Sequence, residues 1–250
     1  MAADGRASLL RKAGGPRKGT RIPTVKSMTS PTLHRCDLVL PCRDEGPALA
    51  LLLPRVPAGI NVVVVDNGST DATAEIAHAH GAVVVAESRP GYGAAVHAGL
   101  EATTRELVAV MDGDGSFDPA AVVPLLEEVA AGRADLAVGR RRPVRRGVWP
   151  WHARLGNALV VGWMRRRRGL PVHDIAPLRV GRRTDLLGLG VEDRRFGYPV
   201  ELLHRAVAAG WRITEHDVAY LPRAEGTRSK VSGSVRGSVR AARDFWKVLR

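Results

Sequence analysis

The chain is 250 residues long, 45% of them hydrophobic, and carries a formal net charge of +13. This length and composition predict a globular protein with a substantial core. Apolar runs such as residues 48–53 and 62–65 are far shorter than the roughly 18 residues of a membrane-spanning helix, and the N-terminus has no apolar stretch typical of a secretory signal. Cys36 and Cys42 are too few for a disulfide framework or a zinc site, so we expect reduced thiols and a cytoplasmic location.

The positive charge is concentrated in three parts of the chain. Residues 1–35 hold eight Lys and Arg against one acid, residues 228–250 hold seven against one, and residues 36–227 hold 23 of each sign. Within that neutral middle, residues 140–183 carry thirteen arginines against the single acid Asp174. Such a block predicts binding to an anionic group on a nucleic acid, a lipid surface or a phosphorylated substrate, or else a solvated Arg-rich face.

Short apolar runs alternate with helix-like segments through the first half of the chain. The expected strands are residues 36–40, 62–65, 82–86, 107–111 and 135–138. The expected helices are residues 72–80, 94–102 and 120–131, the last of them capped by Asp118 with Pro119 in its first turn. This alternation predicts an α/β fold with a doubly wound, mostly parallel sheet flanked by helices, in a single domain.

A polar cluster follows four of the expected strands, at the place where open doubly wound sheets bind their ligands. The clusters are residues 41–45, 66–71, 89–93 and 112–114. The last one holds Asp112 and Asp114, two like charges that are separated by one glycine at the end of an apolar run. Turn chemistry alone explains an isolated Asp-Gly-Asp sequence, but four clusters at strand ends favour a ligand site.

The sequence Gly91-Tyr92-Gly93 imitates the opening of a dinucleotide-binding loop. The third glycine of that loop is missing, with Val96 in its region, and the first strand is followed by PCRDE instead. An incomplete glycine pattern is weak evidence, so we do not expect NAD binding.

Eight segments, in chain order, resemble the family-two glycosyltransferases with a GT-A fold: PCRDEG, VVVVDNGSTD, RPGYGAAVHAGL, VAVMDGDGSFDP, LAVGRR, HDIAPLR, FGYPVELLHRAVAAGW and RAEGTRSKVSG. The branch of the dolichol- and polyprenyl-phosphate mannosyl- or glucosyltransferases is the most similar one. The resemblance runs from about Cys36 to Gly233. It implies a GT-A domain over residues 36–230 that transfers a sugar, with inversion, from a donor of the GDP-mannose or UDP-glucose type.

The resemblance also implies a divalent cation, Mg²⁺ or Mn²⁺, that neutralises the charge of the leaving diphosphate. Its ligands would be Asp112, Asp114 and Ser116. The positions that match donor-binding residues of the family are Pro41, Arg43, Glu45, Asp66, Gly93, Asp112 and Gly113. Arg43 stands where an aromatic residue is common, which leaves the base of the nucleotide open.

The acceptor half departs from many relatives that glycosylate a hydroxyl group. Those relatives have an acidic pair about six residues before a helix arginine, matched here by Arg205, and its aspartate is the general base. This chain has Tyr198 and Pro199 at the matching positions. A phosphate acceptor is already ionised and needs no such base, so the missing pair favours a polyprenyl phosphate.

The resemblance places acceptor-binding or phosphate-binding residues at Arg140, Arg179, Glu201, Arg223 and Lys230. Asp174 and Arg223 join Asp112 and Asp114 as expected catalytic residues, with Asp174 as an alternative base or as an organiser of Arg179. Glu201 is equally well explained as a helix carboxylate that pairs with Arg205 four residues later.

The two ends of the chain carry separate expectations. Residues 1–35, rich in Gly, Pro, Ser and Arg, predict a disordered basic extension. Residues 231–250 predict a basic amphipathic helix, because apolar residues recur there at three- and four-residue steps with arginines on the other faces. Such a helix suits peripheral contact with the inner face of an anionic membrane or docking on the domain, although two glycines weaken it.

Three rival functions agree with parts of the sequence. They are a glycosyltransferase with a soluble phosphorylated or hydroxyl acceptor, a sugar nucleotidyltransferase of similar fold, and a nucleic-acid-binding protein. The nucleotidyltransferase is disfavoured because no Gly-rich phosphate loop with a basic residue follows the first strand. Nucleic-acid binding is disfavoured by the neutral middle of the chain and by its eleven aromatic residues, which give few stacking platforms.

Overall fold

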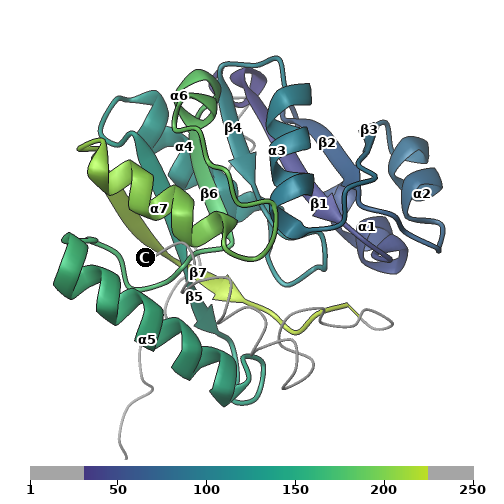
Figure 1. Cartoon of the computed structure of the whole chain (residues 1–250). Helices are drawn as coiled ribbons and strands as arrows, with labels where there is room; N and C mark the ends of the chain where they lie inside the picture. Colours follow the sequence, from purple (N-terminus) through teal and green to yellow (C-terminus); the bar gives the residue numbers. More distant parts are fainter. Residues whose placement is uncertain (1–30, 225–250) are drawn as a thin grey trace, which may run out of the picture.

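The computed structural model describes residues 31–224 as one α/β unit. Its seven-stranded sheet has the order β3-β2-β1-β4-β6-β5-β7 (Figure 1). The strands are β1 (Cys36–Cys42), β2 (Asn61–Asp66), β3 (Val83–Ala86), β4 (Leu107–Val110), β5 (Leu136–Pro143), β6 (Leu178–Arg182) and β7 (Ile213–Tyr220). Neighbouring strands are parallel except where β6 pairs antiparallel with β4 and β5.

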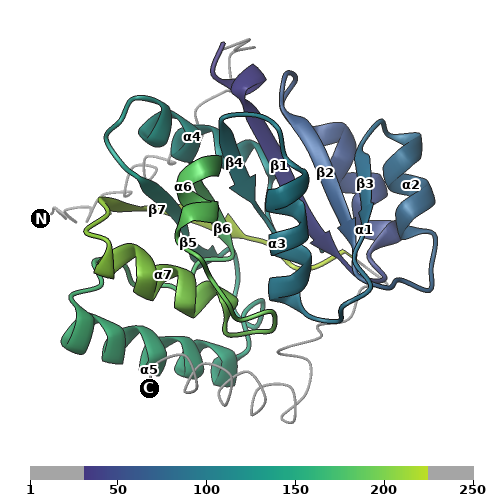
Figure 2. The ribbon, with the colours of Figure 1, turned by 45° about the horizontal axis from the view of Figure 1, so that its top comes forward.

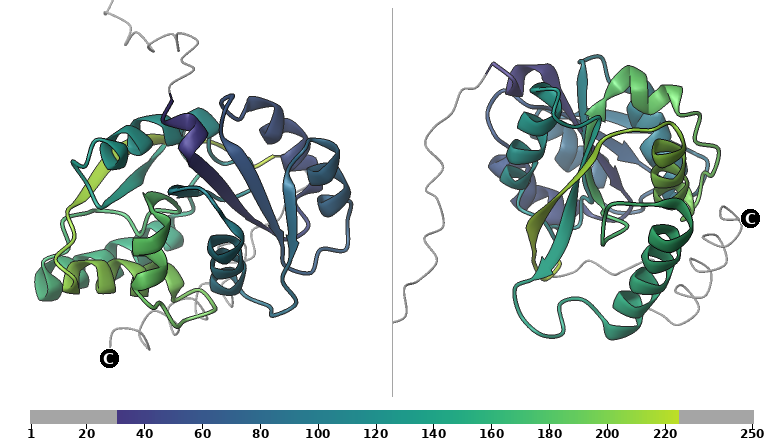
Figure 3. Two further views of the ribbon diagram at one scale, coloured as in Figure 1. Left: turned by 90° about the horizontal axis from the view of Figure 1, so that it is seen from above. Right: turned by 90° about the vertical axis from the view of Figure 1, so that its left-hand side faces the viewer.

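Helices cover both faces of the sheet, as Figure 3 shows in its side view. They are α1 (Gly46–Leu52), α2 (Thr73–Ala79), α3 (Tyr92–Ala102), α4 (Val122–Ala130), α5 (Trp151–Arg168), α6 (Arg183–Gly188) and α7 (Tyr198–Ala208). Short 3-10 turns lie at Leu33–Arg35, Leu53–Arg55 and Pro119–Ala121. One core cluster joins the sheet to α3, α5, α6 and α7, and a second joins it to α1, α2 and α4. Burial of these two apolar faces is the main term that stabilises such a layered domain.

The predicted fold class is confirmed, and the first four strands lie within two residues of their predicted bounds. Asp118 caps the 3-10 turn Pro119–Ala121 that leads into α4, with its carboxylate accepting a hydrogen bond from the Ala120 N–H at 3.0 Å, whereas α4 itself begins at Val122. Helix α1 was not predicted, because its residues read only as an apolar run.

Strand β5 is longer than predicted, because it continues through Arg140–Arg142 to Pro143. These polar residues stay in the sheet because β7 pairs with them in register, from Arg140 opposite Asp217 to Pro143 opposite Tyr220. An ion pair between Arg142 and Asp217, at 2.8 Å, links the two strands. A cross-strand charge pair of this kind makes an arginine-rich segment compatible with a strand.

The predicted boundary of a disordered extension at residue 35 is too late. Residues 33–35 form a 3-10 turn in which Leu33 is buried, and Arg35 forms an ion pair with Glu106 at 2.5 Å. The remaining predictions for the ends, namely the extension up to residue 30, the role of Lys230 and the helix at 231–250, fall outside the described residues.

The strand order reverses between β1 and β4, since the chain builds outward from β1 to β3 on one side and from β4 onward on the other. Ligands of doubly wound sheets bind at such a switch point, beyond the carboxyl ends of the strands. The carboxyl ends of β1 and β4 and, because β6 is antiparallel, the amino end of β6 all reach this edge. No described helix combines the length and the hydropathy that crossing a bilayer requires.

Candidate active site

Backbone contacts tie the loops after β1 and β2 together at the switch point. The Asn67 N–H donates to the Cys42 carbonyl at 2.9 Å, and the Asp44 N–H donates to Ser69 Oγ at 2.9 Å. The Asp66 carboxylate accepts from the Ser69 N–H at 2.9 Å. These hydrogen bonds hold the two loops together at one edge of the sheet. The predicted donor-binding residues at this edge are Pro41, Arg43, Glu45 and Asp66.

The turn after β4 carries Asp112 and Asp114 against the end of β1. A Cβ atom at Gly113 would lie 2.4 Å from the Cys42 sulfur, so only glycine lets the turn approach β1 this closely. Asp114 is buried, and its Oδ1 accepts from the Ser116 N–H at 3.0 Å. The predicted aspartate pair is thus held rigidly at the strand end.

The segment after β7 returns from the far edge of the sheet to this aspartate turn. The Leu221 N–H donates to the Ser116 carbonyl at 2.9 Å, and the Ala224 N–H donates to the Asp114 carbonyl at 3.2 Å. Between these two anchors, the Arg223 Nε lies 2.5 Å from Asp114 Oδ2. Arg223, which the sequence predicts as an acceptor-phosphate contact, thus lies against the aspartate turn.

Several carboxylates lie close together around the ends of β1, β2 and β4. Burial, followed by the nearby carboxylates of Glu45, Asp114, Asp112 and Asp66, raises the pKa of the Cys42 thiol well above its usual value. Burial and the charge of Asp114 likewise raise the pKa of Asp112 to about 6, although Arg223, Arg179 and Arg141 act in the opposite direction. Mutual repulsion of this kind is relieved when a cation binds between the carboxylates.

Arg179 carries a buried guanidinium in which two nitrogen atoms have no hydrogen-bond acceptor in the described part of the chain. It lies on β6 opposite Val110 of β4 and is only 3% exposed. Neither its Nε nor its Nη1 has a hydrogen-bond partner within residues 31–224, and the buried hydroxyl of Tyr92 has none there either. Its charge reaches both Asp112 and Tyr92, because it lowers the pKa of each against the effect of burial. Buried N–H groups without acceptors are costly unless a ligand supplies the acceptors.

Arg141 binds Asp174 at two points, which sequence reasoning did not foresee. Its Nε donates to Asp174 Oδ2 at 2.9 Å and its Nη2 to Oδ1 at 2.6 Å. The guanidinium stacks 3.9 Å from the ring centroid of Trp149 and 5.7 Å from that of Tyr220. Arg141 outweighs the effect of burial and keeps the pKa of Asp174 below its ordinary value. Asp174 thus organises Arg141 rather than Arg179, and a carboxylate held this way is a poor proton acceptor.

The predicted acceptor residue Arg140 lies beside Asp174 but contacts a different carboxylate. Its Nη1 is 3.9 Å from Glu215 on β7. The same Glu215 carboxylate accepts from the His173 N–H at 2.6 Å and the Asp174 N–H at 3.1 Å. Arg140 therefore supports the loop that carries Asp174, whereas Arg141 reaches the carboxylate itself.

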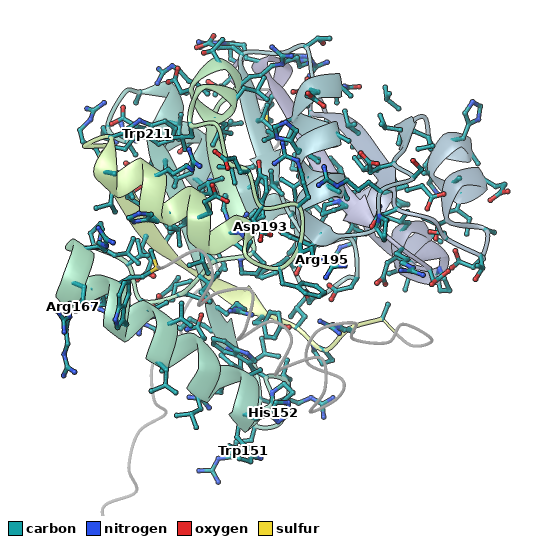
Figure 4. All side chains as sticks on the ribbon, viewed as in Figure 1. Trp151, His152, Arg167, Asp193, Arg195 and Trp211 are labelled. Atoms are coloured by element: carbon teal, nitrogen blue, oxygen red, sulfur yellow. The ribbon has the colours of Figure 1, made fainter. Side chains whose placement is uncertain are left out.

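Gly93 and Glu201 both form hydrogen bonds with the loop at residues 191–197. Figure 4 labels Asp193 and Arg195 in this loop. The Gly93 N–H donates to the Arg195 carbonyl at 3.0 Å, and a Cβ at Gly93 would lie 2.7 Å from the Asp193 carbonyl oxygen. Glu201 accepts from the Asp193 N–H at 2.7 Å and from Arg205 Nε at 2.6 Å. The alternative of a helix carboxylate paired with Arg205 is therefore observed for Glu201, and Gly93 has a packing role.

Asn67 is a positioning residue that sequence reasoning passed over. Its side-chain N–H₂ donates to the carbonyls of Glu87 and Arg89 at 2.9 and 2.8 Å, and its Oδ1 accepts from the Gly91 N–H at 2.9 Å. The Asp-Asn-Gly sequence after β2 was the available signal, since an Asn in that context often holds a neighbouring loop. Asn67 fixes the loop that leads into α3.

The carboxylates of this site suit a hard divalent cation. Asp112 and Asp114 offer oxygen ligands, and the buried Ser116 hydroxyl has no hydrogen-bond partner among the described residues. Within residues 31–224 there is no group of three or more His, Cys, Asp or Glu side chains that could hold a metal by itself. Two carboxylates fit Mg²⁺ or Mn²⁺ when a phosphate-bearing substrate supplies further oxygens, since these ions are often bound in this shared way.

Comparison with known proteins identifies the class of protein that this fold and site define. The family model described as glycosyl transferase family 2 matches residues 37–186. An uncharacterized glycosyltransferase of Mycobacterium tuberculosis is 57% identical over 212 residues, which cover 85% of this chain and 96% of that protein. An undecaprenyl-phosphate mannosyltransferase of Micrococcus luteus is 30% identical over 217 residues, covering 80% and 88%. The chain belongs to glycosyltransferase family 2.

Solved structures agree with this assignment at the level of the fold. Glucosyl-3-phosphoglycerate synthase from Mycobacterium tuberculosis, in complex with Mn²⁺, UDP and glucosyl-3-phosphoglycerate, superposes with a TM-score of 0.67 and 22% identity. The match covers 86% of this chain and 78% of that one. The predicted GT-A-type fold is confirmed. Because the chain belongs to this family, its enzyme class is glycosyltransferase rather than nucleotidyltransferase.

Proposed function

We propose that the chain is a metal-dependent, inverting glycosyltransferase that moves a sugar from a nucleotide-diphosphate sugar to a polyprenyl phosphate. The observation that carries the proposal is Arg179, which is 3% exposed and has Nε and Nη1 without partners in the described residues. A buried guanidinium of this kind calls for an anionic group at the reaction centre. A phosphate acceptor and a leaving diphosphate both provide one.

The donor half is built around Asp112 and Asp114. When bound, Mg²⁺ or Mn²⁺ would be held by these carboxylates, with Ser116 as the further oxygen ligand, and would neutralise the charge that develops on the diphosphate. Glu45 and Asp66, on the rim beside them, would accept hydrogen bonds from the base and ribose. The solved structures of the synthase from Mycobacterium tuberculosis contain Mn²⁺ or Mg²⁺ with UDP, which supports this arrangement.

The acceptor half is cationic and offers no free carboxylate base among the assigned residues. Arg141 and Arg179 lie near Asp112, since both lower its pKa. Arg141 would hold the acceptor phosphate, and Arg179 would contact both that phosphate and the diphosphate of the donor. Asp174 and Glu201 are already engaged by Arg141 and Arg205. An ionised phosphate oxygen attacks without giving up a proton, so an acceptor of this chemistry suits the site.

The reaction then follows from the placement of charge. A phosphate oxygen of the acceptor attacks the anomeric carbon opposite the diphosphate and forms the new carbon–oxygen bond. The bond between that carbon and the diphosphate oxygen breaks, and the nucleoside diphosphate leaves with the electron pair. Arg223, which is paired with Asp114 at 2.5 Å, would stabilise the negative charge that develops on the leaving diphosphate. Configuration inverts, because there is one displacement.

Two comparisons bear on the acceptor. The relative from Micrococcus luteus is named for mannosyl transfer to undecaprenyl phosphate and is 30% identical, which supports a lipid phosphate. A soluble phosphorylated acceptor is the second candidate, because the arginines recognise phosphate rather than a lipid chain, and the synthase of similar fold is named for a phosphoglycerate product. Of the two candidates, only the lipid phosphate requires the enzyme to reach a membrane.

The test is transfer from UDP-glucose and GDP-mannose, with Mn²⁺ or with EDTA, to a short polyprenyl phosphate, to 3-phosphoglycerate and to a neutral sugar. We expect metal-dependent transfer to the polyprenyl phosphate at a rate that falls only as the acceptor phosphate becomes protonated. Transfer confined to 3-phosphoglycerate would establish the second candidate. A preference for the neutral sugar, with a pH profile that Asp174→Asn removes, would overturn the phosphate acceptor altogether.

Neighbouring arginines on β5 provide a matched pair of variants. Arg141→Gln should raise the acceptor KM strongly and leave donor hydrolysis almost unchanged, because Arg141 lies by Asp112 and the aromatic rings of Trp149 and Tyr220. Arg140→Gln removes an equal charge one residue away but loses only the 3.9 Å contact to Glu215, so its effect should be small. Equal effects of the two substitutions would contradict the assignment of Arg141.

A further inference from the structure

The outward side of α5 exposes large apolar side chains. Trp151, Leu155 and Leu159 recur at four-residue steps, so they lie on one side of the helix, and they are 76%, 51% and 63% exposed. Val144, in the loop that leads to α5, is 52% exposed. The other large hydrophobic residues exposed in the described chain, Leu51 and Val83, belong to separate elements. We call Trp151, Leu155 and Leu159 the α5 outer face.

Exposed arginines lie before this face, within it and beyond its C-terminal end. They are Arg145 and Arg146 before α5, Arg154 within it, and Arg165, Arg166, Arg167 and Arg168 in its last turn. Asp174, the single acid in residues 140–183, is buried and paired with Arg141. No nearby carboxylate of that segment offsets the positive charge, so the α5 outer face is both apolar and cationic.

The opposite side of α5 faces the catalytic centre. Asn157 is buried, and its Oδ1 accepts from the Ile175 N–H at 3.0 Å and from Arg141 Nη2 at 3.4 Å. Helix α5 lies along one border of the molecule beneath α7 (Figure 2). Figure 4 shows Trp151 pointing outward at the start of the helix and Arg167 pointing outward near its end. One helix thus joins the arginine cluster of the site to an exposed apolar surface.

We propose that the α5 outer face docks on the surface of an anionic phospholipid bilayer. The apolar side chains enter the boundary between headgroups and acyl chains, while the arginines around them contact lipid phosphates. Tryptophan suits this depth because its ring is apolar and its N–H stays hydrated. Docking places α5, which contacts Arg141 through Asn157, against the membrane. The membrane contact is independent of the acceptor, and only its use in delivering a polyprenyl phosphate rests on the proposed function.

Charge distinguishes the bilayer from the other partners that an apolar helix could have. A second copy of the chain in a symmetric dimer would bring the same arginines together from both sides, and like charges at close range oppose that contact. A nucleic acid would satisfy the arginines but would leave the aliphatic side chains of Leu155 and Leu159 without an apolar partner. An anionic bilayer satisfies both features.

The experiment is sedimentation of the full chain with vesicles, without any nucleotide sugar or acceptor. Vesicles of phosphatidylcholine with phosphatidylglycerol are compared with vesicles of phosphatidylcholine alone. We expect binding to the anionic vesicles that weakens as salt is raised. The double variant Leu155→Ser, Leu159→Ser should bind about tenfold or more weakly, because it removes two inserting side chains. Arg166→Gln with Arg167→Gln should bind several-fold more weakly.

The matched control is Leu51→Ser, since Leu51 on α1 is 66% exposed but lies on another element. It should bind vesicles as the parent does, and thermal unfolding should show all variants folded. Vesicle binding that Leu155→Ser, Leu159→Ser leaves unchanged would overturn the proposal, as would no binding to anionic vesicles. A parent dimer that this variant dissociates would instead assign the face to a second copy. Membrane binding together with transfer only to 3-phosphoglycerate would leave the docking face standing and refute the lipid acceptor.

Discussion

Replacement of Arg179 by methionine tests whether this residue binds a ligand or stabilises the fold. The guanidinium is 3% exposed, and its Nε and Nη1 have no partner within residues 31–224. A buried donor without a partner costs about 1–3 kcal/mol, so an apolar side chain of similar length relieves two such costs. Part of the gain is offset, because Arg179 also attracts the Asp112 carboxylate. We expect Arg179→Met to stabilise the free protein by about 1–3 kcal/mol, or about 2–10 °C in Tm.

The pH dependence of this gain follows from Asp112, whose pKa is raised to about 6. Below that pH the carboxyl is neutral, and removal of Arg179 forfeits no attraction. Above it the carboxylate is charged, and the lost attraction subtracts from the gain. The stabilisation by Arg179→Met should therefore be larger at pH 5 than at pH 8.

The assay is thermal unfolding at both pH values, with a titration of Mn²⁺ and UDP at pH 8. The variant should bind UDP at least tenfold more weakly, because hydrogen bonds to charged groups contribute about 1.5–3 kcal/mol each. Arg212→Met is the control, since Arg212 is exposed and paired with Asp135 at 2.7 Å, and it should cost up to about 1 kcal/mol with normal binding. An Arg179→Met protein that is less stable at both pH values and binds UDP normally would refute the reasoning.

Three further substitutions test single contacts. Asp114→Asn should abolish metal-dependent transfer while far-UV circular dichroism shows an intact fold, and wild-type turnover in EDTA would contradict the metal site. Gly93→Ala should lower the free energy of unfolding by about 2 kcal/mol or more, since its Cβ would lie 2.7 Å from the Asp193 carbonyl oxygen. Gly162→Ala is the control, because open space surrounds Gly162, and it should raise the free energy of unfolding by up to about 1 kcal/mol. Glu201→Gln should cost about 1–3 kcal/mol in urea unfolding and leave the acceptor KM near normal, whereas a raised KM with unchanged stability would restore an acceptor-binding role.

The donor half of the site was predictable because local signals agree there. Each polar cluster directly follows an apolar run, so strand ends and candidate ligands are read from the same residues. Asp112 and Asp114 fall at the end of β4, and Pro41–Glu45 and Asp66 at the ends of β1 and β2. Because the strands are parallel, their carboxyl ends meet at one edge of the sheet, so no knowledge of long-range contacts is needed to predict that these residues lie together.

The acceptor half depends on contacts between distant segments, which local patterns do not encode. Arg140 and Arg141 are neighbours in a run of three arginines, and which of them reaches Asp174 is set by the register of β5 and by the 170s loop. Arg179 reaches the site because β6 inserts antiparallel between β4 and β5. Gly93 was read as a donor contact, but the carbonyls of residues 193–195, a hundred positions later, determine its surroundings.

The return of the segment after β7 to the aspartate turn affects how the enzyme is made. Leu221 and Ala224 bond to Ser116 and Asp114, so the turn after β4 gains its last backbone partners only when the chain beyond residue 220 has been synthesised. During translation the N-terminal strands can pair first, yet Asp114 stays without Arg223 until β7 and the segment after it have joined the edge of the sheet. A nascent chain that ends before residue 221 would therefore lack both backbone contacts to the aspartate turn and the ion pair between Arg223 and Asp114.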